Sequence, residues 1–176
     1  GYVPRSKKAA QTKVFFQIRT DSNTPTLTLK AGLVLVGEQE RTNYLFSIPE
    51  DITTTVVDGI AQFGTESEPI IAYQGTYLQN LFTYDGSLDQ RFIINNSSMD
   101  YNTLSVRIKD ANETGSGNLW RKVENIIQVD STDEVYFINE VENEYYELIF
   151  GDGIFGKPLQ TGQIINATYI ITDGET

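Results

Sequence analysis

The chain has 176 residues, of which 39% are hydrophobic and 11% aromatic, so a core of ordinary domain size can form. Its 24 acidic and 13 basic residues give a formal net charge of -11, which repels a phosphate backbone and argues against nucleic acid as a partner. Because histidine and cysteine are both absent, the sequence excludes disulfides, histidine-ligated zinc, cysteine nucleophiles and a Ser-His-Asp triad.

No stretch of the sequence approaches the roughly 18 uninterrupted apolar residues of a membrane helix. The start of the chain also lacks the apolar core of a secretion signal. We therefore expect a soluble protein without membrane insertion. Because the chain opens with Gly1 and its one methionine is Met99, we also expect it to be a fragment of a larger polypeptide.

Along the first half of the chain, short runs of alternating apolar and polar residues predict strands separated by turns. The expected strands cover residues 14–19, two stretches within 26–37, and residues 44–48, 52–57 and 70–77. Asp58-Gly59 and the segment 21–25 have the composition of turns. Residues 61–70 contain two acids and a proline, and we expect them to run over the surface.

The second half continues this pattern around a polar loop. Strands are expected at residues 81–84, 91–94, 104–109, 135–138, 145–150 and 164–171. Asp85-Gly86 predicts a hairpin turn, and residues 139–143 predict a hairpin loop of about five residues. The polar segment 110–118 predicts a loop, and the apolar spacing within residues 120–127 favours one helical turn at most.

Many short strands and no convincing helix indicate an all-β protein. We expect an antiparallel β-sandwich or two small packed β subdomains, with little or no helix. The expected division is an N-terminal β subdomain of residues 1–78, with a basic lead segment, and a C-terminal β subdomain of residues 79–176. One continuous domain is the alternative.

The most informative segment runs from Tyr146 to Ile165 and couples a strand to a glycine-rich turn and then to another strand. We expect the chain to reverse here and pair again through a structural turn motif. The residues of this motif are Gly151, Asp152, Gly153, Gly156 and Gly162. Asp152 is expected to bond neighbouring backbone amides. The spacing fits neither an EF-hand calcium loop nor a phosphate-binding loop, which leaves an adventitious cation as the alternative.

Six carboxylates in the same half of the chain raise the question of acid/base catalysis. They are Asp133, Glu134, Glu140, Glu142, Glu144 and Glu147. Three of them fall in the predicted hairpin loop, where solvated acids are ordinary, and a catalytic pair needs a pocket that raises one pKa. We therefore predict no catalytic residue, no metal ligand and no cofactor, and we expect the protein not to be an enzyme.

Carbohydrate binding through exposed aromatic side chains is a second alternative. The candidate platform comprises Tyr73, Tyr77, Tyr84, Tyr101 and Trp120. Most of these residues fall on strand faces where aromatic side chains fill cores, yet acidic, tyrosine-rich β modules often bind sugars. A carbohydrate- or receptor-binding β module of a tail or cell-surface protein therefore stays open.

Several segments, taken in order, carry a resemblance to a known family. They are QRFIINNSSMDYNTLSV at residues 90–106, Trp120, VYFI at 135–138, YELIFGDGIFGKPLQTGQII at 146–165 and ATYIITDG at 167–174. Together they resemble the T4-type baseplate wedge subunit, which belongs with the baseplate J-like proteins of contractile-tailed phages. The basic start, VPRSKKAAQTKVFFQI, is similar to the family's lead into its first strand.

The resemblance implies a structural protein of the virion, located in the tail baseplate and assembled in the host cytoplasm. Its implied partners are other baseplate wedge subunits, with self-association in the full-length protein, and its implied role includes transmitting the contraction signal. No enzymatic activity and no cofactor come with it. Among single residues, only the turn glycines and Asp152 carry over.

The start of the chain is basic although the rest is acidic. Its cationic residues are Arg5, Lys7, Lys8 and Lys13. From this charge asymmetry alone we expect the segment to dock against an acidic surface.

Overall fold

The computed structural model describes residues 6–21 and 23–173. Within this part the chain forms fifteen strands and two 3-10 turns, so the predicted all-β class is confirmed. Residues 79–169, with the segment that ends at Lys7, form one compact unit, and residues 8–78, with the segment that begins at Ile170, form the other. The expected division after residue 78 coincides with one passage of the chain between the units. In contrast to the expectation, residues 6–7 belong to the same unit as residues 79–169, and residues 170–173 belong to the same unit as residues 8–78.

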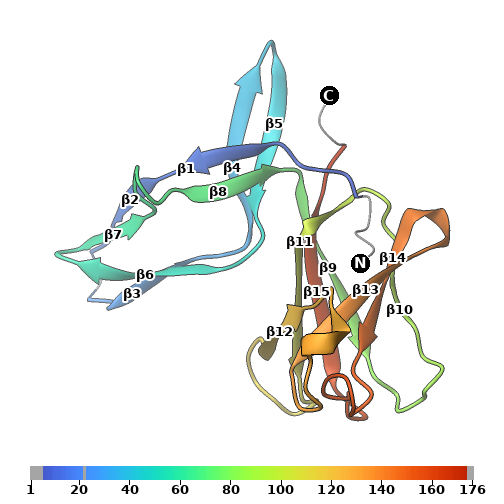
Figure 1. Ribbon diagram of the computed structural model, residues 1–176. Coiled ribbons are helices and arrows are strands. Elements are labelled where there is room, and N and C mark those ends of the chain that lie inside the picture. The colour runs from blue at the N-terminus through green and yellow to red at the C-terminus, as the bar shows by residue number, and fades with distance from the viewer. Residues whose placement is uncertain (1–5, 22, 174–176) are drawn as a thin grey trace. The chain divides into compact units, whose positions relative to one another are not determined.

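The unit of residues 8–78, here called the ribbon unit, contains eight strands. They are β1 Gln11–Val14, β2 Phe16–Arg19, β3 Thr26–Leu29, β4 Gly32–Gln39, β5 Thr42–Ile48, β6 Ile52–Val57, β7 Ile60–Phe63 and β8 Ile70–Gln74. One four-stranded sheet has the order β1-β8-β5-β4 and the other has the order β2-β7-β6-β3. The two orders match place by place, because β1 is followed in sequence by β2, β7 by β8, β5 by β6 and β3 by β4. The two sheets are therefore halves of one bent antiparallel ribbon (Figure 1).

Two-residue turns join neighbouring strands of this ribbon. Glu40 and Arg41 link β4 to β5 with φ of 51° and 67°, and Asp58 and Gly59 link β6 to β7 with φ of 51° and 73°. Two consecutive positive φ angles are typical of a type I′ turn, whose twist matches that of the flanking strands. The predicted Asp58-Gly59 turn is therefore confirmed.

The bend of the ribbon between β3 and β4 is held by Asp51, which lies in the connection between β5 and β6. Its Oδ1 accepts the N–H of Ala31 at 2.8 Å, and its Oδ2 pairs with Nζ of Lys30 at 2.9 Å. A side chain of one connection thus fixes the backbone of the connection beside it.

The prediction that residues 61–70 run over the surface is wrong for their first part. Ala61 and Phe63 lie in β7 and are 0% and 1% exposed. Phe63 also stacks on Phe16 of β2, with ring centroids 5.3 Å apart. The strand has only four residues, two of them buried, and the turn before it fixes its register against β6, so the alternation in the sequence is too brief to reveal it.

The unit of residues 79–169, here called the sheet unit, is built around one seven-stranded sheet. Its strands are β9 Thr76–Thr83, β10 Phe92–Ile94, β11 Met99–Lys109, β12 Asn118–Lys122, β13 Val135–Val141, β14 Tyr145–Phe150 and β15 Ile164–Ile171. Their order is β10-β14-β13-β12-β11-β15-β9. The pair β12–β13 is parallel, in contrast to the wholly antiparallel sheets that we expected.

The core of the sheet unit is rich in aromatic side chains. Phe150 meets Phe92 edge to face at 5.5 Å between ring centroids, and it meets Trp120 in the same manner at 5.8 Å. Edge-to-face pairs of this kind stabilise a core beyond the area that they bury. Met99 and Ile94 are fully buried in the same core, and β11 is buried along most of its length.

Two of the predicted strand reversals are wrong and one is confirmed. β14 and β15 flank the glycine-rich segment but are separated in the sheet by β13, β12 and β11, and β9 and β10 lie at opposite edges. Both connections are too long for a hairpin turn. The turn expected at Asp85-Gly86 is nevertheless present, since the N–H of Ser87 donates to Oδ1 of Asp85 at 2.7 Å and Gly86 has a φ of 90°. β13 and β14 do form the expected hairpin, although the three residues Glu142–Glu144 replace the longer loop. Ile126–Gln128 forms the single expected helical turn.

Candidate functional site

The glycine-rich connection between β14 and β15 is organised around the carboxylate of Asp152. Its Oδ1 accepts the N–H of Phe155 at 2.8 Å and the N–H of Ile154 at 2.9 Å. These backbone hydrogen bonds, with that from Phe155 the stronger, hold the pKa of Asp152 below its ordinary value. The expected bonds from Asp152 to neighbouring amides are therefore present, and they commit the carboxylate to its own loop.

The predicted turn glycines serve different needs within this connection. Gly153 has a φ of 88°, and its N–H donates to the carbonyl of Gly156 at 3.0 Å. At Gly151 the constraint is space, because a Cβ there would overlap the backbone of Gly156. Gly156 and Gly162 also have positive φ, of 97° and 90°, and Gly162 lies apart from the others at the far end of the connection.

Backbone hydrogen bonds tie the connection to two other loops of the sheet unit. The N–H groups of Gly156 and Lys157 donate to the carbonyls of Asp130 at 3.0 Å and Asp133 at 2.8 Å. At its far end, the N–H of Gly162 donates to the carbonyl of Tyr84 at 2.8 Å. Ile154 and Phe155 stay on the outside of this bonded assembly, 67% and 42% exposed. The site is thus a braced loop that presents two apolar side chains.

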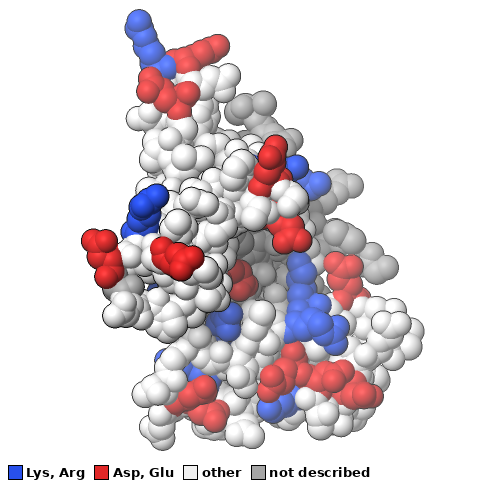
Figure 2. Space-filling view, turned by 90° about the vertical axis from the view of Figure 1, so that its left-hand side faces the viewer, with Lys and Arg blue, Asp and Glu red and all other residues white. Residues whose placement is uncertain are grey.

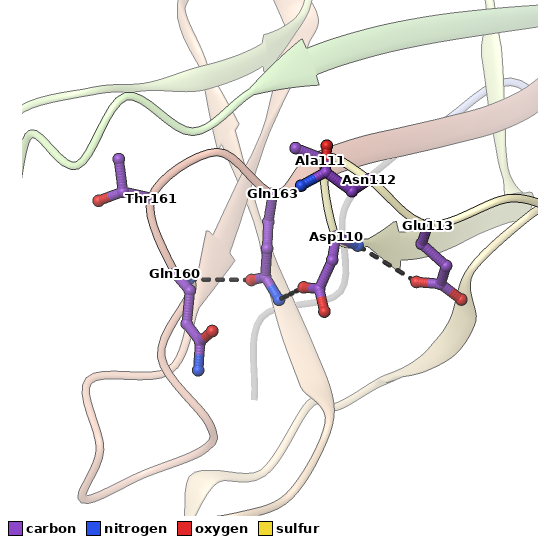
Figure 3. Close-up of a pocket in the computed structure, with 7 residues that line it drawn as sticks. All are labelled: Asp110, Ala111, Asn112, Glu113, Gln160, Thr161 and Gln163. Atoms are coloured by element: carbon purple, nitrogen blue, oxygen red, sulfur yellow. Dashed lines mark hydrogen bonds between the residues drawn. The ribbon is translucent and has the colours of Figure 1, made fainter.

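A polar pocket of about 480 Å³ opens beside the far end of the same connection (Figure 3). Nε2 of Gln163 donates to Oδ1 of Asp110, and Oε1 of Gln163 accepts the N–H of Gln160, both at 2.9 Å. Glu113 accepts the N–H of Asp110 at 3.2 Å. The lining residues are Asp110, Ala111, Asn112, Glu113, Gln160, Thr161 and Gln163. Much of the polar lining is bonded within the protein, and no aromatic residue belongs to it.

A more apolar groove of about 590 Å³ lies beside β10 and β14 of the sheet unit. On it, Nε of Arg91 donates to both carboxylate oxygens of Glu147, at 3.0 Å and 3.2 Å. The hydrogen bond and the charge of Glu147 raise the pKa of Arg91. Leu88 stands at the groove and is 97% exposed. Neither this ion pair nor the groove was predicted, because the two partners lie 56 residues apart in the sequence.

The structure does not assemble the five aromatic residues of the carbohydrate hypothesis into one exposed platform. Trp120 and Tyr101 are 3% and 5% exposed, and Tyr73, Tyr77 and Tyr84 are half-buried. Lys122 Nζ lies 3.6 Å from the centre of the Tyr101 ring, and the Tyr101 hydroxyl donates to Glu124 at 3.2 Å. Burial, followed by the charge of Glu124, raises the pKa of Tyr101 to about 12. Trp120 and Tyr101 therefore pack inside the protein and do not present a ring face to a ligand.

The six clustered carboxylates are dispersed over separate contacts. Glu147 pairs with Arg91, Glu134 pairs with Lys157 at 3.0 Å, and Asp133 accepts the N–H of Asp130 at 2.8 Å. Glu140 lies in β13 opposite Tyr146, before the loop in which we expected it, and Glu142 and Glu144 are exposed in the β13–β14 hairpin. Over residues 6–21 and 23–173, no three acidic side chains are placed to hold a metal ion. In the same residues, no helix is long and apolar enough to cross a membrane.

The basic start of the chain contacts the first part of β11 where it is described. Lys7 Nζ donates to the hydroxyl of Ser98 at 3.4 Å, and the hydroxyl of Ser6 accepts the N–H of Tyr101 at 3.1 Å. Arg5 lies outside the described residues, and Lys8 and Lys13 are exposed. Figure 2 shows acidic and basic side chains interspersed on the face that it draws.

No protein-family model matches the sequence, and no curated protein matches it either.

Proposed function

We propose that the chain is a structural module of a contractile-tail baseplate wedge, which joins neighbouring wedge subunits and helps to transmit the contraction signal. The observation that carries the proposal is where the resembling segments lie. The segments quoted from residue 90 onward contribute to β10 through β15, which are six of the seven strands of the sheet unit, and the less specific basic start contributes to β1 and β2 of the ribbon unit. The main part of the resemblance thus covers nearly the whole sheet of one unit, which supports the proposal for that unit.

The bonding of the β14–β15 connection supports a mechanical role. Force applied at the exposed Ile154 and Phe155 would pass through the backbone hydrogen bonds of Gly156 and Lys157 into the segment that leads to β13. Loops that are joined by hydrogen bonds move as one body, because one of them can open only when the bonds to the others break. We therefore propose this connection as a contact point for a neighbouring wedge subunit.

The proposal can be tested in cells that produce the phage particles. An affinity-tagged copy of the chain should co-sediment with assembled tails and cross-link to wedge subunits. The double variant Ile154→Lys with Phe155→Lys should keep its melting temperature and lose most of this recovery. Leu81→Lys, a control at another exposed apolar side chain of the sheet unit, should be recovered like the wild type. Recovery without any tail protein would contradict the proposal.

Carbohydrate or receptor binding is the second candidate, and the polar pocket at Asp110 and Gln163 is the observation that favours it. Amide and carboxylate groups can bond sugar hydroxyls, but stacking on an aromatic ring, which many sugar sites use, has no counterpart in the lining. A glycan array separates the two candidates. Binding that is lost in both Asn112→Ala and Gln160→Ala would replace the wedge proposal with this one.

A further inference from the structure

The outer part of β4 and β5 is a two-stranded hairpin. β5 pairs with β8 at Phe46 and Ser47, and the carbonyl of Leu45 accepts the N–H of Gly75 at 2.8 Å, so among the described strands only β4 pairs with residues 42–44. β4 itself is the edge strand of its sheet along all of its length. An isolated two-stranded hairpin is marginally stable in water, and an unprotected edge is a template for another strand.

A β-bulge gathers three exposed apolar side chains on one face of this hairpin. The register shifts between Leu33, opposite Ser47, and Leu35, opposite Phe46. Because residues directly opposite one another share a face and successive residues alternate, the shift moves Leu33 onto the face of Val36 and its partner Leu45. These three side chains are 59%, 53% and 44% exposed. Without the bulge, Leu33 would lie on the other face.

Apart from the bulge, the β4 edge lacks the features that usually protect such strands. Residues 31–37 contain neither a charged residue nor a proline. The charges stand outside this apolar stretch and differ in sign along the strand. Lys30 precedes it, with a side chain that is 79% exposed, and Glu38 and Glu40 follow it. Asp51 takes one hydrogen bond from Lys30, whose ammonium group has three donors.

We propose that the β4 edge pairs antiparallel with the β4 edge of a second copy of this chain. In this arrangement the end of β4 that carries Glu38 and Glu40 lies beside the end of the other copy's strand that follows Lys30. Parallel pairing would instead place like charges together. The apolar face of Leu33, Val36 and Leu45 then continues across both hairpins. The inference rests on the self-association included in the proposed function and assigns it a surface.

Sedimentation at low salt over a concentration series tests the pairing. The wild type should form a dimer that dissociates on dilution. Val36→Lys should be monomeric wherever the wild type is dimeric, because a lysine on an edge blocks pairing. Val57→Lys is the matched control, since Val57 is 64% exposed in another hairpin of the ribbon unit, and it should dimerise like the wild type. Melting curves show that each variant is folded.

Charge reversal tests the direction of pairing. Lys30→Glu alone, and Glu38→Lys with Glu40→Lys, should each weaken the dimer at least tenfold, because like charges then face each other at both ends. An equimolar mixture of the two variants should restore dimers, because every facing pair becomes opposite in charge.

A wild type that is monomeric at all concentrations, or a Val36→Lys variant that dimerises normally, overturns the inference. So does a mixture that fails to restore dimers. None of these results bears on recovery of the chain with phage tails, which tests the proposed function separately.

Discussion

Asp152 and Phe155 are joined by a hydrogen bond of 2.8 Å from the Phe155 N–H to the Asp152 carboxylate, which closes the glycine-rich loop on itself. Asp152→Ala removes this bond and its companion from Ile154, so we expect the melting temperature to fall. The melting temperature of Asp152→Asn should fall less, since an amide oxygen still accepts both N–H groups. Equal melting temperatures for Asp152→Ala and the wild type would show that the loop is closed by other contacts.

The same carboxylate predicts a dependence on pH. The pKa of Asp152 is lowered from 3.8 in the folded protein, because the charged form accepts the backbone N–H groups. Its stabilising contribution is therefore complete above pH 3.8 and is lost as the pH falls through the lower folded-state pKa. The difference in melting temperature between the wild type and Asp152→Asn should be constant near neutral pH and shrink at acidic pH. A difference that widened on acidification would contradict the assigned direction.

Gly151 and Gly153 should respond differently to alanine. At Gly153 the added Cβ has free space, its nearest atom lying 3.9 Å away, so the cost comes from the positive φ and is about 1–3 kcal/mol. At Gly151 the Cβ would overlap the backbone of Gly156, which forces the loop to shift and costs about 3 kcal/mol or more.

Urea unfolding of both variants measures this order, and Gly115→Ala is the control. Gly115 has a φ of 108° in open space and should behave like Gly153. If Gly153→Ala proved the more destabilising of the two loop variants, the steric account of Gly151 would be wrong.

Local sequence pattern predicted those features that depend on neighbouring residues. The strand at residues 52–57, the Asp58-Gly59 turn and the β13–β14 hairpin all follow from alternation and turn chemistry. Pairing partners could not be predicted in the same way. β14 and β15 are separated by three strands, and their connection bonds to Asp130 and Asp133, neither of which a local pattern encodes.

The candidate contact surfaces were hidden for a related reason. Residues 33–36 are apolar without a break and so assign no face to either Leu33 or Val36, and the bulge that unites these two on one face appears only in the pairing with β5. The Asp152 hydrogen bonds, in contrast, followed from the ordinary preference of aspartate for nearby backbone amides. Gly151 shares the residue type of Gly153 and could not be assigned its separate, steric role without the fold.

The buried phenol of Tyr101 predicts a loss of stability at alkaline pH. Burial raises its pKa to about 12, so ionisation opposes folding between pH 10 and pH 12. Stability is therefore full below pH 10 and is lost as the pH rises towards 12. The difference in absorbance at the tyrosinate band between the wild type and Tyr101→Phe isolates this group, and its midpoint should lie near 12. A midpoint near 10 would show that the phenol is solvated.

The bend of the ribbon unit should depend on Asp51 more than on Lys30. Asp51→Ala removes the bond to the Ala31 N–H and should destabilise the protein by about 1–2 kcal/mol. Lys30→Ala breaks only an exposed ion pair, whose side chains are 79% and 48% exposed, and should cost less than about 1 kcal/mol. Asp51→Asn keeps an acceptor for the N–H of Ala31, so its loss of stability should lie between those of Asp51→Ala and Lys30→Ala. Urea unfolding at low and high salt measures all three variants. If Lys30→Ala cost as much as Asp51→Ala, and salt reduced both effects equally, the ion pair would hold the bend instead of the backbone bond.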